Sequence, residues 1–241
     1  MNSLSSYLAD AWRFFAANLV SIIAVLLPLL IPIQLAFAFA AGGAPDPEAA
    51  ELSDTGFLVV FASLMLYPVY QGALICFIDS RVELTGGSIR SYYSVAMQLW
   101  MPMLAMYAMT LVAVAAVASV FALPGVAIFG GTAGIGLLVL PALYVFARLS
   151  YAEFYCLLEK RPAFESVVLS WRSTEEQQWM LVPGVSLVWT LTTLPVFLAQ
   201  NAMPSLRDSA SISGFLFAIA AGVFSSLLTI FRYRLYTQRP Q

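Results

Sequence analysis

The sequence predicts an all-α, polytopic membrane protein with six transmembrane helices arranged as three hairpins. The first observation is composition: 61% of the 241 residues are hydrophobic and only 10% are charged, whereas a soluble domain has about 25% charged residues. The second observation is a mean hydropathy of +0.86. The third is a series of six apolar runs, each near the ~20 residues that a helix needs to cross a bilayer. These observations exclude a soluble globular domain and a disordered chain.

Each apolar run is expected to be a helix, because a chain in lipid must satisfy its backbone hydrogen bonds internally. The runs are residues 19–41, 57–78, 101–123, 126–147, 180–199 and 212–231. A turn at Pro124-Gly125 is expected to separate the third run from the fourth. The chain is therefore predicted to form a single integral membrane domain over residues 1–241.

The loops between the runs differ in charge, and this difference predicts the orientation. Segment 42–56 contains four acidic residues and no basic one. Ten of the eleven basic residues lie on the opposite side: Arg13, Arg81, Arg90, Arg148, Lys160, Arg161, Arg172, Arg232, Arg234 and Arg239. The positive-inside rule then predicts that both termini are cytoplasmic.

A cleaved signal peptide is the alternative interpretation of the N-terminal region. Small residues at Ala36-Phe37-Ala38 and Ala38-Phe39-Ala40 resemble cleavage sites. The apolar run is, however, longer than the usual core of a signal peptide, and Asp10 lies beside Arg13 in the segment before it. We therefore expect an uncut first span.

An amphipathic helix is predicted before the first, third and fifth spans, on the cytoplasmic side. Apolar residues at spacings of three and four form one stripe in each; the stripes are Leu4, Tyr7, Leu8, Ala11, Trp12 and Phe15, then Ile89, Tyr92, Tyr93, Ala96, Met97 and Trp100, then Phe164, Val167, Val168 and Trp171. Such helices lie in the membrane interface with aromatic rings at headgroup depth.

These three helices have two possible roles. They are either a docking collar for lipid headgroups or a protein partner, or elbows that orient the hairpins. The candidate interface or lipid contacts are Trp12, Arg13, Arg81, Trp100, Arg161, Trp171 and Arg172.

The residue types that are missing from the sequence exclude several kinds of catalytic and metal-binding site. The chain contains no His and two Cys, which excludes Ser-His-Asp catalysis and a four-thiolate metal site within it. No phosphate-binding or dinucleotide-binding motif is present, so no cofactor is expected. No basic tract is present, so nucleic acid is not an expected partner.

The predicted spans contain no ionisable residue near a midplane, which argues against a proton-coupled pump. Asp79, Arg148 and Glu153 are expected at cytoplasmic ends of spans. Gln34 and Gln71 are the candidate intramembrane polar contacts. Each forms either an interhelical hydrogen bond or a contact to a substrate.

Similar residues recur at a spacing near 80. Cys76 and Cys156 are one such pair, and Arg81 and Arg161 are another. This spacing suggests parallel repeats over residues 1–80, 81–160 and 161–241, arising from duplication or only from shared topology.

Four short motifs carry a resemblance to a known family. They are Trp12-Arg13-Phe14-Phe15 followed by Asn18, Leu123-Pro124-Gly125-Val126, Ser170-Trp171-Arg172, and Phe231-Arg232-Tyr233-Arg234-Leu235-Tyr236. The chain resembles the YciC-like family of uncharacterised bacterial inner-membrane proteins. More loosely, it is similar to the membrane domain associated with glycerophosphodiester phosphodiesterases. The resemblance implies a six-span protein of the bacterial inner (plasma) membrane and no catalytic residue.

The functional expectation is a non-enzymatic inner-membrane protein, a structural or regulatory component of the cell envelope. Its expected partners are membrane lipids and a membrane or cytoplasmic protein. The alternative is a small permease or lipid transporter, and an enzyme ranks third. The oligomeric state is left open.

Overall fold

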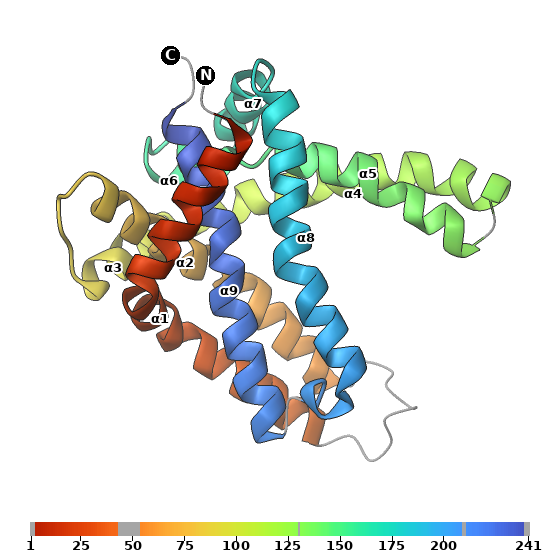
Figure 1. Cartoon of the computed structure of the whole chain (residues 1–241), viewed down its shortest axis with the longest axis horizontal. Helices are drawn as coiled ribbons and strands as arrows, with labels where there is room; N and C mark the ends of the chain where they lie inside the picture. Colours follow the sequence, from red (N-terminus) through yellow and green to blue (C-terminus); the bar gives the residue numbers. More distant parts are fainter. Residues whose placement is uncertain (1–2, 43–53, 130, 209–210, 239–241) are drawn as a thin grey trace. The chain divides into compact units, whose positions relative to one another are not determined.

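The computed structural model describes residues 3–42, 54–129, 131–208 and 211–238, and side chains within these ranges except at 40–42, 54–55, 121–129 and 131–138. The described residues form helices and no strand, which confirms the all-α prediction (Figure 1). The elements are α1 (Leu4–Gly42), α2 (Asp54–Val82), α3 (Ile89–Gln98), α4 (Trp100–Phe129), α5 (Gly131–Arg148), α6 (Ala152–Leu157), α7 (Ala163–Ser173), α8 (Gln178–Ala202), the 3-10 turn η1 (Pro204–Leu206) and α9 (Ile212–Thr237).

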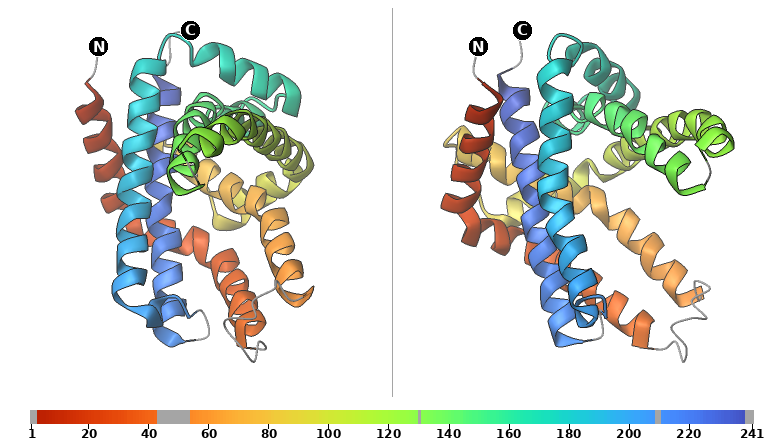
Figure 2. Two further views of the ribbon diagram at one scale, coloured as in Figure 1. Left: turned by 90° about the vertical axis from the view of Figure 1, so that its right-hand side faces the viewer. Right: turned by 45° about the vertical axis from the view of Figure 1, so that its right-hand side comes forward.

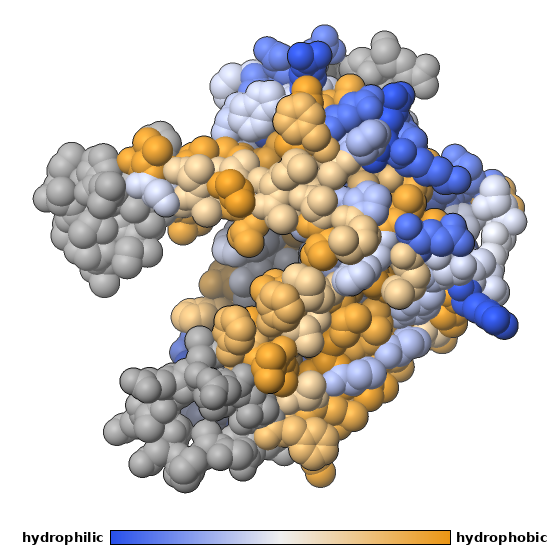
Figure 3. All heavy atoms as spheres, turned by 180° about the vertical axis from the view of Figure 1, so that it is seen from behind, coloured by the Kyte–Doolittle hydropathy of each residue, from blue (hydrophilic) through white to orange (hydrophobic). Residues whose placement is uncertain are grey.

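Five helices among the described residues are long and apolar enough to cross a membrane. These spans are Leu4–Phe39, Gly56–Val82, Trp100–Val120, Gln178–Ala202 and Ile212–Thr237. Less than half of the most apolar window in each is buried, with shares between 11% and 44%. Most of the visible surface of the long helices is hydrophobic (Figure 3). Five such helices, with so much apolar surface left uncovered, indicate a multi-pass membrane protein.

The expected turn at Pro124-Gly125 is wrong. Helix α4 continues through these two residues to Phe129, and α5 begins at Gly131. The run from residue 101 to 147 contains no charged residue, and proline and glycine are tolerated within helices of such apolar segments. The predicted fourth span, 126–147, therefore begins within α4, and its side chains up to residue 138 lie outside the described residues.

The first amphipathic helix is not a separate element, which corrects the prediction of three distinct ones. Helix α1 runs without interruption through Trp12 and into the first span. No glycine or proline lies between Leu4 and Pro28 to end the helix. The side chain of Asn18 donates to the carbonyl oxygen of Phe14 at 2.9 Å and so remains within the helix. The second and third amphipathic helices are α3 and α7, each separate as predicted. Most of the acidic segment 42–56 lies outside the described residues.

The chain divides into two compact units. Unit 1 contains Met1–Leu8, Gln98–Leu187 and Phe231–Gln241, and unit 2 contains Ala9–Met97 and Val188–Ile230. The three repeats of about 80 residues stay a prediction.

In unit 2, α1 packs against α9, where the rings of Phe15 and Phe224 meet edge to face at 6.2 Å. Two tyrosines fix α3: Tyr93 donates to the carbonyl oxygen of Val25 at 2.6 Å, and the hydroxyl of Tyr92 lies 2.8 Å from that of Ser80. The second part of α8 and the first part of α9 lie side by side (Figure 2). Unit 2 is thus a helical bundle with α3 packed against it.

In unit 1, α4 and α5 pack side by side along their length, and α6 and α7 pack against α4 (Figures 1 and 2). Gly184 of α8 is a point of close approach in the same unit. A Cβ atom there would lie 2.5 Å from the ring of Phe231, which is fully buried. Only glycine therefore fits at this position without displacing a neighbour.

Candidate functional site

Helix α7 buries its small polar residues rather than its apolar ones. Ser166 and Ser170 of α7, and Thr174 directly after its end, are four residues apart, lie on one face and are fully buried. The hydroxyl of Ser170 donates to the carbonyl oxygen of Arg148 at 2.8 Å and accepts from the backbone N–H of Tyr151 at 3.1 Å. Thr174 donates to the same carbonyl oxygen at 3.1 Å, whereas Ser166 donates to the carbonyl oxygen of Pro162, four residues earlier. These bonds fix the face of α7 that meets the rest of unit 1, because buried hydroxyls need partners.

The apolar stripe of α7 is consequently left on the outside. Phe164 is 69% exposed and Trp171 is 40% exposed, while Val168 is partly exposed. A helix of a soluble protein turns its apolar stripe toward the core. The opposite arrangement is typical of a helix whose apolar face meets lipid.

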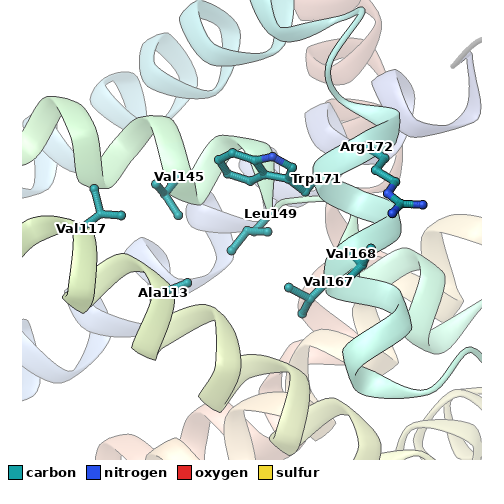
Figure 4. Close-up of a pocket in the computed structure, with 8 residues that line it drawn as sticks. All are labelled: Ala113, Val117, Val145, Leu149, Val167, Val168, Trp171 and Arg172. Atoms are coloured by element: carbon teal, nitrogen blue, oxygen red, sulfur yellow. The ribbon is translucent and has the colours of Figure 1, made fainter.

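An open, apolar groove of about 370 Å³ lies between α7 and the α4–α5 hairpin, within unit 1 (Figure 4). It is lined by Ala113, Val117, Val145, Leu149, Val167, Val168, Trp171 and Arg172. The indole of Trp171 points toward the residues of α5, whereas the guanidinium of Arg172 points away from the apolar lining. The groove therefore combines a hydrophobic wall with one positive charge at its edge.

Arg148, at the end of α5, is a buried cation next to this groove. It is 4% exposed, and it donates to the hydroxyl of Thr174 at 2.9 Å, to Oε1 of Gln178 at 2.9 Å, and to the carbonyl oxygen of Trp171. Its guanidinium also lies 4.5 Å from the ring centre of Trp171. The ion pairs that the described residues form do not include Arg148. Among the described residues its hydrogen-bond acceptors are neutral oxygens, and its guanidinium helps to hold Trp171 in place.

A second buried charged cluster lies elsewhere in unit 1. Arg232 of α9 and Glu153 of α6 form an ion pair at 2.8 Å, with side chains 5% and 3% exposed. Tyr107 of α4 donates to the other carboxylate oxygen of Glu153 at 2.7 Å. The cluster joins three helices, which indicates a structural role.

These buried charges were not expected from the sequence. Arg148 and Glu153 were predicted at cytoplasmic ends of spans, and Arg232 was counted among the basic residues of the cytoplasmic side. Hydropathy and loop charge indicate only how far along the chain a residue lies from an apolar run. They contain no information on whether another helix covers the residue. The stripe of Ser166, Ser170 and Thr174 did carry a signal, namely three small hydroxyl residues at helical spacing.

The structure brings together only two of the predicted interface residues, Trp171 and Arg172, which line the same groove. Trp12 is 52% exposed and stacks on Phe15. Arg13 is exposed and lies 3.8 Å from Asp10.

The other three predicted interface residues differ in their surroundings. Arg81 lines a small pocket of about 170 Å³ in unit 2, with its guanidinium 5.6 Å from the ring centre of Phe77. Arg161 pairs with Glu165 at 2.9 Å. Trp100 is half-buried at the start of α4.

Of the two predicted intramembrane polar residues, Gln71 is engaged with its neighbours. It is 7% exposed; its amide nitrogen donates to the hydroxyl of Tyr67 at 2.7 Å, and its amide oxygen accepts from Thr229 of α9 at 3.3 Å. Gln34 is half-buried in α1. Gln71 thus forms the interhelical hydrogen bond that was one of its two predicted roles.

The residues that the structure describes contain no group of His, Cys, Asp and Glu side chains able to hold a metal ion. Comparison of the chain with family models, curated proteins and solved structures finds no match.

Proposed function

We propose that the protein is a non-enzymatic component of the bacterial inner membrane, structural or regulatory in role, that contacts lipid through α7. One observation carries this proposal: α7 buries Ser166, Ser170 and Thr174 and exposes Phe164 and Trp171. Because water penalises exposed rings and the interface accommodates them, lipid is the natural environment of this stripe. The hydrogen bonds of Ser170 and Thr174 to the carbonyl oxygen of Arg148 hold the helix in that orientation.

The topology that accompanies this function has six spans in three hairpins and both termini in the cytoplasm. In this topology, the five long apolar helices are five of the spans, and α5, which pairs with α4, is the remaining one. Orientation rests on the concentration of basic residues on one side. A reporter that is active only in the cytoplasm is expected to be active when it is fused after residue 241. Activity of a periplasmic reporter at that position would contradict the orientation.

The alternative, a small permease or lipid transporter, requires polar groups that line a path. Gln71 is the best buried candidate, and its amide is occupied by Tyr67 and Thr229. This occupancy favours a packing role over substrate contact and therefore supports the structural proposal over the transporter.

The test uses Trp171 as a depth probe. Changing Trp12, Trp100, Trp179 and Trp189 to Phe leaves Trp171 as the sole tryptophan, because the chain has five. The full-length variant is reconstituted into phosphatidylethanolamine–phosphatidylglycerol vesicles that contain lipids brominated along the acyl chain. We expect strong quenching of Trp171 by bromine near the headgroup and weak quenching by aqueous acrylamide. The opposite pattern would show that α7 faces water.

A second measurement separates the structural role from transport. The full-length protein is purified with native lipids, and the lipids and proteins that remain bound are identified by mass spectrometry. Trp171→Ala is expected to reduce the bound material, whereas Gln71→Leu is expected to leave it unchanged. The reverse sensitivity would favour the transporter.

A further inference from the structure

The groove between α4, α5 and α7 has the dimensions and surface of a binding site for an extended hydrophobic chain. Its volume of about 370 Å³ falls within the about 300–1,000 Å³ of typical ligand pockets. Seven of its eight lining residues are apolar. Val145 and Leu149 form a buried floor, each 5% exposed. An acyl chain needs only such an apolar wall, because it has no polar group to satisfy.

Two arginines lie at this groove, Arg172 in its lining and Arg148 next to it. The stem of Arg172 contributes to the lining while its guanidinium points outward (Figure 4), which is how an arginine at a membrane interface places its charge in the headgroup layer. The buried guanidinium of Arg148 adds a second charge beneath Trp171, at 4.5 Å from the ring centre. Among the described residues, neither arginine forms an ion pair.

A buried cation surrounded by neutral acceptors is costly unless a negative charge lies near it. Arg148 meets this description, since it donates to hydroxyl, amide and carbonyl oxygens. Arg172 directly follows Trp171, whose carbonyl oxygen accepts from Arg148, so an anion held by this part of α7 would partly offset the charge. The charge of the site therefore complements an anionic headgroup, as its apolar wall complements an acyl chain.

We propose that this groove binds one acyl chain of an anionic phospholipid, with the phosphate of that lipid on the guanidinium of Arg172. The proposal rests on the proposed function, since α7 must lie in the membrane interface for a lipid to reach the groove. The lipid-binding proposal adds three properties to that function: a defined binding site, one bound lipid per protein, and a preference for a negatively charged headgroup. Arg148 acts as a positioning residue for Trp171 and strengthens the attraction to the anion.

The test measures lipid binding to the full-length protein in dodecylmaltoside by native mass spectrometry. Phosphatidylglycerol, phosphatidylcholine of the same chain length and palmitate are each titrated. Arg172→Gln removes the charge at the groove, and Arg90→Gln is its control, an exposed arginine of α3 in unit 2. Val117→Trp fills the groove, and Val112→Trp is its control, because Val112 lies on the same helix, is 68% exposed and does not line the groove.

We expect one saturable phosphatidylglycerol, bound more tightly than phosphatidylcholine. Arg172→Gln should weaken phosphatidylglycerol binding about fivefold, from the roughly 1 kcal/mol that one basic residue contributes at an anionic surface, and Arg90→Gln should leave it unchanged. Val117→Trp should abolish the bound lipid, and Val112→Trp should retain it. Equal retention of the two phospholipids, equal effects of the two arginine variants, or lipid retained in Val117→Trp would overturn the proposal.

Four further outcomes are distinguishable. If Val117→Trp does not give a monodisperse protein, the wild-type lipid preference and the two arginine variants decide the question. Palmitate bound as tightly as phosphatidylglycerol would overturn the assignment to a phospholipid. If Trp171 is quenched by brominated lipid while the groove variants keep their phosphatidylglycerol, the groove assignment fails and the proposed function stands. If brominated lipid does not reach Trp171, both fail.

Discussion

Replacing Arg232 by Met tests whether the buried ion pair with Glu153 stabilises unit 1. The wild-type atoms lie 2.8 Å apart, with side chains 5% and 3% exposed. At an effective dielectric constant of about 20, two charges at this distance attract by about 6 kcal/mol. That attraction offsets a desolvation cost of several kcal/mol per ion. The variant leaves the carboxylate buried without its cationic partner, although Tyr107 still donates to it, so we expect the free energy of unfolding to fall by about 3–5 kcal/mol.

The assay is unfolding of the full-length protein in dodecylmaltoside by increasing sodium dodecyl sulfate, followed by far-UV circular dichroism. Arg161→Met is the matched control, because its pair with Glu165 at 2.9 Å is about half exposed and should be worth less than about 1 kcal/mol. The double variant Glu153→Gln/Arg232→Met removes both buried charges and should recover most of the loss, which a double-mutant cycle measures. The reasoning is refuted if Arg232→Met loses no more than Arg161→Met, or if the double variant is less stable than Arg232→Met alone.

Three further predictions use the same protein. Gly184→Ala should lower the free energy of unfolding by about 1–3 kcal/mol in the same assay, since its Cβ would meet a rigid buried ring. Gly222→Ala should lower it by less, because the Cβ there meets the flexible end of a leucine side chain at 3.0 Å. Equal losses in the two variants would contradict the steric argument. Gln71→Leu should lower the free energy of unfolding by about 1 kcal/mol, and a stabilised variant would show that its hydrogen bonds contribute nothing. Burial raises the pKa of the Cys156 thiol to about 11 from 9.0. In a Cys76→Ser background, N-ethylmaleimide should therefore label Cys156 at pH 8 about 100-fold more slowly than an ordinary thiol, and the labelling rate should increase as the pH rises toward 11. Rapid labelling at pH 8 before detergent unfolding would contradict the burial of Cys156.

The positions of helices were predictable because they depend on local composition. Five of the predicted spans correspond to helices of the structure that are long and apolar enough to cross a membrane. Two predicted interruptions between helices are absent from the structure, each for a physical reason. The helix continues past Pro124 because an apolar segment tolerates proline, and α1 continues past Asn18 because nothing in that segment ends a helix.

The candidate site was predictable only in part. Trp171 and Arg172 were identified by an amphipathic pattern within one helix, and they line the groove. The contribution of Ala113 and Val117 was not predictable, since they are two apolar residues among many in α4. Their role depends on α7 packing across the hairpin, which no periodicity within α4 encodes.

The sequence by itself determined that this is a helical, multi-pass membrane protein, because hydropathy and helix formation depend on neighbouring residues. Only the tertiary structure decided which stripe of α7 faces inward and which charges are buried. Three hydroxyls are buried through hydrogen bonds to backbone carbonyls that include that of Arg148, and this leaves Trp171 at the groove. Glu153 and Arg232 meet from two helices that are distant in the chain. Contacts of this kind arise from packing, and the composition of each segment alone does not specify them.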